Sequence, residues 1–90
     1  MYAALVTVSI DPAQNDAART MLTDVIVPTV SSAPGFVSGT WLEPVNGKST
    51  AIVVFDTEAN ARATAPPPGP APAGGVVVEK VEFIEVAAHA

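Results

Sequence analysis

Alternating apolar side chains predict four β-strands, at residues 2–10, 36–42, 48–55 and 76–87. In the third strand neither side is polar, which is unusual for a sheet with one face in water. The fourth segment also fits a helical stripe, but three successive valines after a Gly-Gly pair favour a strand. One apolar side of the first strand is formed by Tyr2, Ala4, Val6, Val8 and Ile10.

A helix is predicted to begin after Asp11. The Asp11 carboxylate can accept from free backbone amides, Pro12 has a preset φ angle, and Gln14 can complete a capping box. Pro28 should kink or end this helix, because it lacks an amide donor and its ring clashes with the carbonyl of Asp24. The apolar stripe keeps a spacing of three to four residues and comprises Ala18, Met21, Leu22 and Val25, with Thr29 as a further candidate.

Turn-forming residues separate the remaining elements. The pair Asn46-Gly47 suits a type I′ hairpin turn, so the second and third strands should be antiparallel neighbours. A short second helix is expected at residues 59–65, with a cap within residues 56–58. The Pro/Gly-rich segment 66–75 cannot continue that helix and is expected to be an extended surface connector. The alternative, a ligand for a proline-binding domain, is less favoured because flanking basic residues are lacking.

The βαββαβ order predicts one α+β domain over residues 1–90, with a ferredoxin-like fold. Right-handed crossovers give a four-stranded antiparallel sheet with both helices on one face. The other face would stay uncovered and partly apolar, which is typical of an interface. Burying roughly 800 Å² at about 25 cal/mol per Å² gives on the order of 20 kcal/mol, against an association cost of roughly 4 to 15 kcal/mol. A homodimer is therefore expected.

Composition narrows the classes of partner. Hydrophobic residues make up 49% of the chain and charged residues 14%, the net charge is −5, and there is no cysteine. The four basic residues do not cluster, so we expect neither nucleic acid nor a membrane as a partner. The lack of cysteine and of a basic N-terminal segment suits a cytoplasmic protein.

No cofactor or metal is expected from the residues. Glu79, Glu82 and Glu85 are close in sequence, but strand alternation should turn Glu82 away from the other two. The Gly74-Gly75 pair precedes a strand, whereas a phosphate-binding loop needs a helix after it.

Residues 33–37, Ala-Pro-Gly-Phe-Val, and 51–58, Ala-Ile-Val-Val-Phe-Asp-Thr-Glu, resemble the dimeric α/β-barrel superfamily, and within it the antibiotic-biosynthesis-monooxygenase-like domains. The resemblance implies a barrel built across a dimer, with a cavity between each sheet and its helices for a hydrophobic substrate. Some members oxidise aromatic polyketides without metal or flavin, and others degrade heme. Active members tend to use an asparagine, a tryptophan and a histidine or tyrosine. Here the first strand contains no asparagine, and the second helix contains neither tryptophan nor histidine.

The candidate ligand-binding residues are Trp41, Tyr2, Thr40 and Ser38. Trp41 could form a stacking wall for a flat apolar ligand, with room for its ring beside Gly39, or could be a packing aromatic. Tyr2 could donate to a ligand oxygen or be a packed ring. The sole histidine, His89, is expected to be exposed unless the C-terminal tail docks on a partner.

Two functional hypotheses follow. The first is a small-molecule-binding dimeric barrel, with a cofactor-independent monooxygenase acting on an aromatic or polyketide-like substrate as its more specific form. The second is a non-catalytic dimerisation or accessory domain whose cavity is filled by its own side chains. Whether the protein is an enzyme stays open at this point, and no catalytic residue is assigned.

Overall fold

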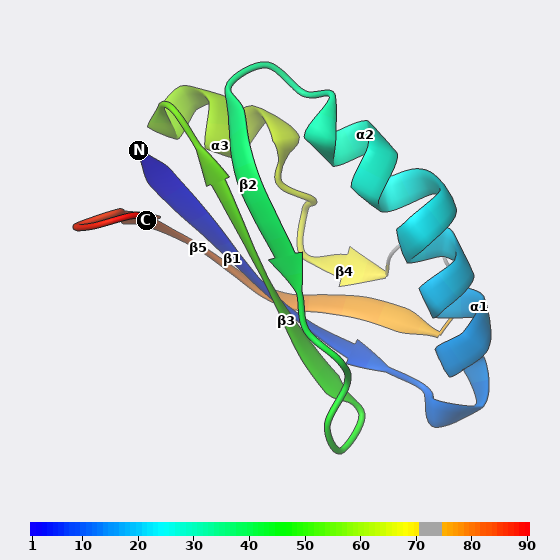
Figure 1. Ribbon diagram of the computed structural model, residues 1–90. Coiled ribbons are helices and arrows are strands. Elements are labelled where there is room, and N and C mark those ends of the chain that lie inside the picture. Colours follow the sequence, from blue (N-terminus) through cyan, green and yellow to red (C-terminus); the bar gives the residue numbers. More distant parts are fainter. Residues whose placement is uncertain (71–74) are drawn as a thin grey trace.

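The computed structural model describes residues 1–70 and 75–90 and contains one antiparallel sheet with helices on one of its faces (Figure 1). This is the predicted ferredoxin-like α+β architecture. The sheet order is β2-β3-β1-β5-β4. Its strands are β1 (Tyr2–Ile10), β2 (Phe36–Trp41), β3 (Lys48–Phe55), β4 (Gly69–Pro70) and β5 (Val76–Glu85). The helical segments are η1 (Pro12–Gln14), α1 (Asn15–Met21), η2 (Leu22–Ile26), α2 (Val27–Ser31) and α3 (Glu58–Thr64).

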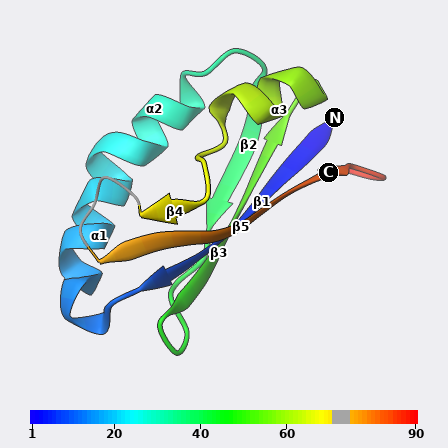
Figure 2. The ribbon, with the colours of Figure 1, turned by 180° about the vertical axis from the view of Figure 1, so that it is seen from behind.

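The sheet has five strands, so the predicted four-stranded sheet is incomplete. The added strand, β4, lies within the segment predicted as a connector and pairs with Val77 and Val78 of β5 (Figure 2). Pro70 is compatible with this position because β4 is an edge strand, where one side needs no amide donor. Residues 71–74 of the predicted connector lie outside the described residues.

The first helical region runs from residue 12 to residue 31, and we call it the long helix (η1, α1, η2 and α2). Its predicted cap is confirmed, since an Asp11 carboxylate oxygen accepts from the backbone amide of Ala13 at 3.0 Å. Pro28 was predicted to kink or end the helix, and the structure shows that it does not end it. A π-helical segment, η2, directly precedes α2, which contains Pro28. The wider turn lies where a regular α-helical register would press the proline ring against the carbonyl of Asp24.

The hairpin between β2 and β3 is confirmed. Asn46 and Gly47 have φ angles of 53° and 75°, the positive values that a type I′ turn requires. Val45 and Lys48 exchange two backbone hydrogen bonds across the turn, of 2.8 and 3.1 Å. The turn thereby fixes which residues of β2 and β3 face the helices.

A β-bulge in β5 corrects the predicted faces of that strand. Thr7 pairs with Lys80 whereas Val8 pairs with Val78, so Glu79 is an extra residue. Strict alternation would place Val78 and Lys80 on one face, but the extra residue puts them on opposite faces. The Glu79 carboxylate accepts from the Lys48 ammonium at 3.0 Å, and this hydrogen bond lowers the pKa of Glu79. Glu79 thus lies on the face away from the helices, together with Glu82, which alternation had placed apart from it.

The buried core lies where α3 crosses β1, β3 and β5. Its centre consists of Val53, Phe55 and Ala61, which are 6%, 1% and 0% exposed. The Phe36 ring meets the Phe55 ring edge to face, with centroids 6.3 Å apart. Further half-buried side chains pack around this centre, namely Tyr2, Val30, Ala33, Trp41 and Phe83.

The opposite face of the sheet, which we call the outer face, has no helix over it in the described residues (Figures 1 and 2). It exposes Ile52 at 38% and Ile84 at 48%, so the predicted open apolar face is present. It also holds the ion pairs Lys48–Glu79 and Lys80–Glu82, at 3.0 and 3.3 Å. The outer face therefore has an apolar part and a charged part.

We expect Asp11→Ala to lower the free energy of unfolding by about 0.5 to 2 kcal/mol, because an amide at the start of the long helix loses its acceptor. Urea unfolding followed by circular dichroism measures the change. Asp24→Ala, an exposed acid in the middle of the same helix, is the matched control and should have a smaller effect. Equal stability of Asp11→Ala and the unmodified protein would contradict the assigned helix start.

Candidate functional site

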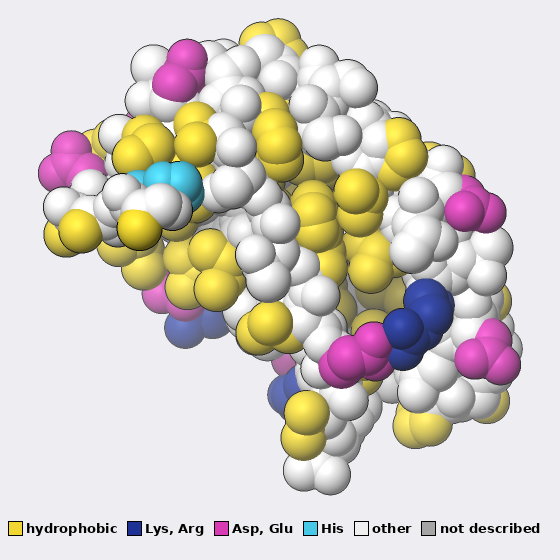
Figure 3. Space-filling view, in the orientation of Figure 1, with side chains coloured by type: hydrophobic (Ala, Val, Ile, Leu, Met, Phe, Trp, Pro, Cys, Tyr) yellow, Lys and Arg dark blue, Asp and Glu magenta, His cyan; other side chains and the backbone are white. Residues whose placement is uncertain are grey.

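The main cavity lies between the long helix and the sheet and has a volume of about 780 Å³. Its floor is formed by helix-facing side chains of β1, including Ala4, Val6 and Val8. Ala51, Val53 and Phe55 of β3 continue that floor. Figure 3 shows a hollow lined by hydrophobic side chains between the long helix and β2. The apolar side of β1 predicted from its alternation therefore lines this cavity.

The cavity exists because the middle of the long helix does not pack closely against the sheet. None of its residues is buried, and Val25 and Ile26 remain 50% and 38% exposed although they line the cavity. At its C-terminal end Val30 packs against the core. At its N-terminal end the Asp11 amide donates to the carbonyl of Gly75 at 2.8 Å. The helix is thus attached at both ends and stands away from the sheet between them.

Trp41 lies at the end of β2 and lines the cavity. It pairs with Ala51 of β3, whose side chain also faces the cavity. The indole lies over Gly39, where a Cβ atom would come within 2.7 Å of two ring carbons. The prediction that Gly39 leaves room for this ring is confirmed. Any side chain at Gly39 would push the indole from its position.

An ion pair crosses the rim of the cavity. The Arg19 guanidinium, from α1, donates to the Glu43 carboxylate beyond the end of β2, and both side chains line the cavity. Their side chains are 60% and 68% exposed, and the hydrogen bond raises the pKa of Arg19. A basic side chain beside acidic ones is visible below the apolar hollow in Figure 3.

Sequence reasoning did not select this pair. Alternation from Trp41 places Glu43 on the same side of the second strand, and this is the signal that the sequence contains. Arg19 lies outside the predicted apolar stripe of the helix, and the hydrophobic pattern does not reveal how far the helix stands from the sheet.

The other candidate ligand-binding residues lie elsewhere. Ser38 and Thr40 pair with Val54 and Ile52 and lie on the outer face, so they do not line the cavity. Tyr2 packs against the core. His89 is exposed, and its Nε2 atom lies 3.2 Å from the Ser38 hydroxyl oxygen. The structure therefore brings only Trp41 of the four to the cavity.

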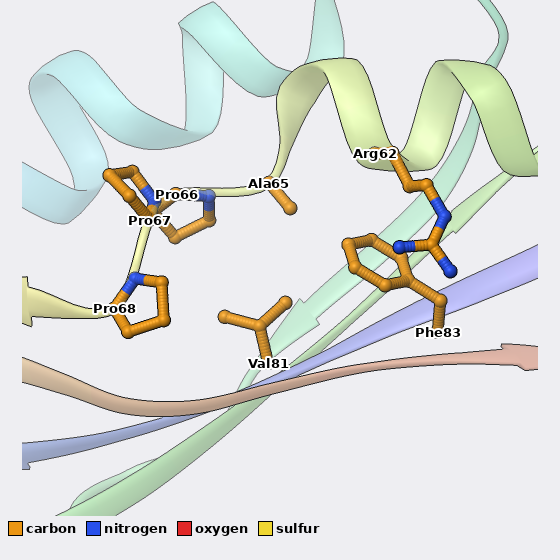
Figure 4. Close-up of a pocket in the computed structure, with 7 residues that line it drawn as sticks. All are labelled: Arg62, Ala65, Pro66, Pro67, Pro68, Val81 and Phe83. Atoms are coloured by element: carbon orange, nitrogen blue, oxygen red, sulfur yellow. The ribbon is translucent and has the colours of Figure 1, made fainter.

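A smaller pocket of about 390 Å³ lies beside the main cavity, between the end of α3 and β5 (Figure 4). The Arg62 guanidinium lies over the Phe83 ring, 4.4 Å from its centroid, as a cation–π contact. Arg62 also donates to Glu58 at 2.8 Å. Ala65 and Pro66 line both this pocket and the main cavity, so they form a shared wall.

Over residues 1–70 and 75–90, no group of three or more His, Cys, Asp or Glu side chains is placed to bind a metal ion. Within the same residues, no helix is long and apolar enough to cross a membrane.

Comparison with known proteins rests on structure. No protein-family model and no curated protein sequence matches the chain. Two solved structures of the heme-degrader MhuD from Mycobacterium tuberculosis do match. The structure with two hemes bound in its active site has a TM-score of 0.70 at 14% identity. The heme-free structure, with cleaved protein, has a TM-score of 0.65 at 20% identity. Each match covers 100% of this chain and 99% of the other.

At these identities the likeness concerns the fold. It extends over the whole chain. The chain therefore shares its overall fold with these two structures.

Proposed function

We propose that this protein binds an apolar, ring-bearing small molecule in the cavity between the long helix and the sheet. The observation that carries the proposal is the cavity itself, about 780 Å³ with mostly apolar side chains around it. Ligand sites are typically concave, largely apolar and of roughly 300 to 1,000 Å³. A flat ring system would have Trp41 as one wall.

A cavity of this size does not favour the alternative of an accessory domain whose cavity is filled by its own side chains. The exposed apolar stripe of the long helix also favours ligand binding over a filled cavity. Val25 and Ile26 line the cavity and remain 50% and 38% exposed. A ligand would remove that apolar surface from water and so stabilise the helix–sheet arrangement.

Heme has to be considered as a ligand of this cavity, because MhuD is a heme-degrader. In this chain the cavity-lining residues include no histidine, cysteine or tyrosine, and Met21 provides their single sulfur atom. His89 lies with Ser38 on the outer face instead. The lining therefore offers no imidazole to an iron centre, and these residues do not fit heme iron ligation by histidine. We propose a ligand that needs no metal ligand from the protein.

Cofactor-independent oxygenation of an aromatic or polyketide-like substrate is the second candidate. It is favoured by Trp41 in the cavity and by the carboxylates of Asp16 and Glu43 at the rim, which are possible proton acceptors. Oxygen uptake with a dihydroxynaphthalene substrate, compared between the unmodified protein and Glu43→Gln, tests it. Uptake no faster than in buffer would reject this second candidate and leave ligand binding unaffected.

We expect Trp41→Ala to weaken binding of the neutral aromatic amide 2-naphthamide by about tenfold, because the ring loses its stacking partner. Isothermal titration calorimetry measures the affinity without relying on tryptophan emission. Trp41→Phe keeps an aromatic wall and should retain most of the affinity.

Unfolding of the same variants separates binding from packing. A large loss of stability in Trp41→Ala with unchanged affinity would assign Trp41 to the core alone. In that case the proposed ligand would not use this wall.

We also propose that the protein is a homodimer formed through the outer face. Support comes from the exposed Ile52 and Ile84 on that face and from the resemblance to dimeric α/β barrels. A cytoplasmic location, suggested by the absence of cysteine, stays a prediction.

Native mass spectrometry at micromolar concentration should give twice the chain mass. We expect Ile52→Glu to convert the protein to monomers, because an unpaired carboxylate would be buried at the interface. Val45→Glu, in the exposed hairpin where Val45 is 69% exposed, should leave the dimer intact. A monomeric unmodified protein would contradict the proposed assembly.

A further inference from the structure

We propose that the ligand of this cavity carries an acidic group, and that Arg19 binds this group at the rim while the apolar body lies inside. The inference rests on the proposed function, since it names the class of ligand for the same cavity.

Arg19 is the single basic residue among the side chains that line the cavity in the described structure. Lys48 and Lys80 form ion pairs on the outer face, and Arg62 lies at the smaller pocket. Most of the remaining lining is aliphatic or aromatic. A ligand that fills the cavity therefore meets one positive charge, and it meets that charge at the opening.

The pairing of Arg19 with Glu43 leaves donors free for a ligand. A guanidinium has five N–H donors arranged in a planar fork. The Glu43 carboxylate accepts from the Nη2 atom, and no other side-chain hydrogen bond of Arg19 is formed within the described residues. A second carboxylate can therefore bind another edge of the guanidinium without breaking the first contact. Glu43 then acts as a positioning residue that keeps Arg19 across the opening.

A cationic ligand fits this rim less well, although Asp16 and Glu43 are also there. To reach the Glu43 carboxylate, a ligand ammonium would have to displace the guanidinium or lie close beside it. Like charges at such short distance repel, and Arg19 would lose its partner. An acid adds a partner to Arg19, whereas an amine competes with it.

The matched probes are 2-naphthoate, 2-naphthamide and 2-naphthylmethylamine, which share one ring system and differ in charge. Isothermal titration calorimetry measures the affinity for each probe, because naphthyl rings absorb and emit in the same range as tryptophan. We expect the unmodified protein to bind 2-naphthoate at least about fivefold more tightly than 2-naphthamide, since charge-assisted hydrogen bonds are the stronger ones. Raising the salt concentration should reduce this preference.

Three variants test whether the preference for the acid over the amide arises at the rim. Arg19→Gln should bind the acid and the amide equally. Glu43→Gln should bind the acid at least as tightly as the unmodified protein, because its amide oxygen can still accept from Arg19 while the repulsion between two neighbouring carboxylates is removed. Arg62→Gln is the matched control, an exposed arginine likewise paired with a glutamate, and should keep the preference. If Arg19→Gln fails to fold, Arg19→Lys keeps the charge without the fork and should show an intermediate preference.

The outcomes separate this inference from the function on which it rests. Equal affinity for acid and amide in the unmodified protein, or a preference for the amine that Glu43→Gln removes, would overturn the inference and leave cavity binding standing. A preference for the acid that survives Arg19→Gln would overturn it too. Absence of measurable binding of all three probes would overturn the proposed function itself.

Discussion

The standoff of the long helix from the sheet is the feature on which the proposed site depends. A helix with an apolar stripe normally buries that stripe against a sheet, and helical stability in proteins comes mostly from such packing. Here the long helix is attached at its ends, by the contact of Val30 with the core and the hydrogen bond from the Asp11 amide to the Gly75 carbonyl, and at the cavity rim by the Arg19–Glu43 ion pair. The sheet below it is anchored separately through α3 and the Phe55 core. The domain can thus keep a cavity without losing its core.

Local signals in the sequence were sufficient for the elements that depend on a few adjacent residues. Asn46-Gly47 specified a turn with two positive φ angles, and Asp11 specified a helix cap, because both depend on chemistry within three or four positions. The alternation of β1 and β3 likewise showed which side chains share a face. These parts of the fold needed no knowledge of distant contacts.

Features that depend on distant contacts were not predictable from the pattern. The bulge at Glu79 carries no glycine or proline signal, and it is visible only in the pairing of β5 with β1. The π-helical turn before Pro28 lets the helix continue, although the proline was predicted to kink or end it. The pairing of Arg19 with Glu43 joins residues 24 positions apart. For the proposed site, the sequence therefore pointed to Trp41, which lines the cavity, but did not point to the Arg19–Glu43 pair at its rim.

The balance of charge and burial would let the rim select a ligand while adding little to stability. An ion pair as exposed as Arg19–Glu43 typically contributes little to folding, because water and salt screen it. A ligand seated in the cavity would cover part of the rim and exclude some of that water. The same guanidinium would then interact in a lower effective dielectric, where charge-assisted hydrogen bonds are stronger. Arg19 thus adds little to the stability of the free protein, but in the proposed complex it would discriminate between acidic and neutral ligands.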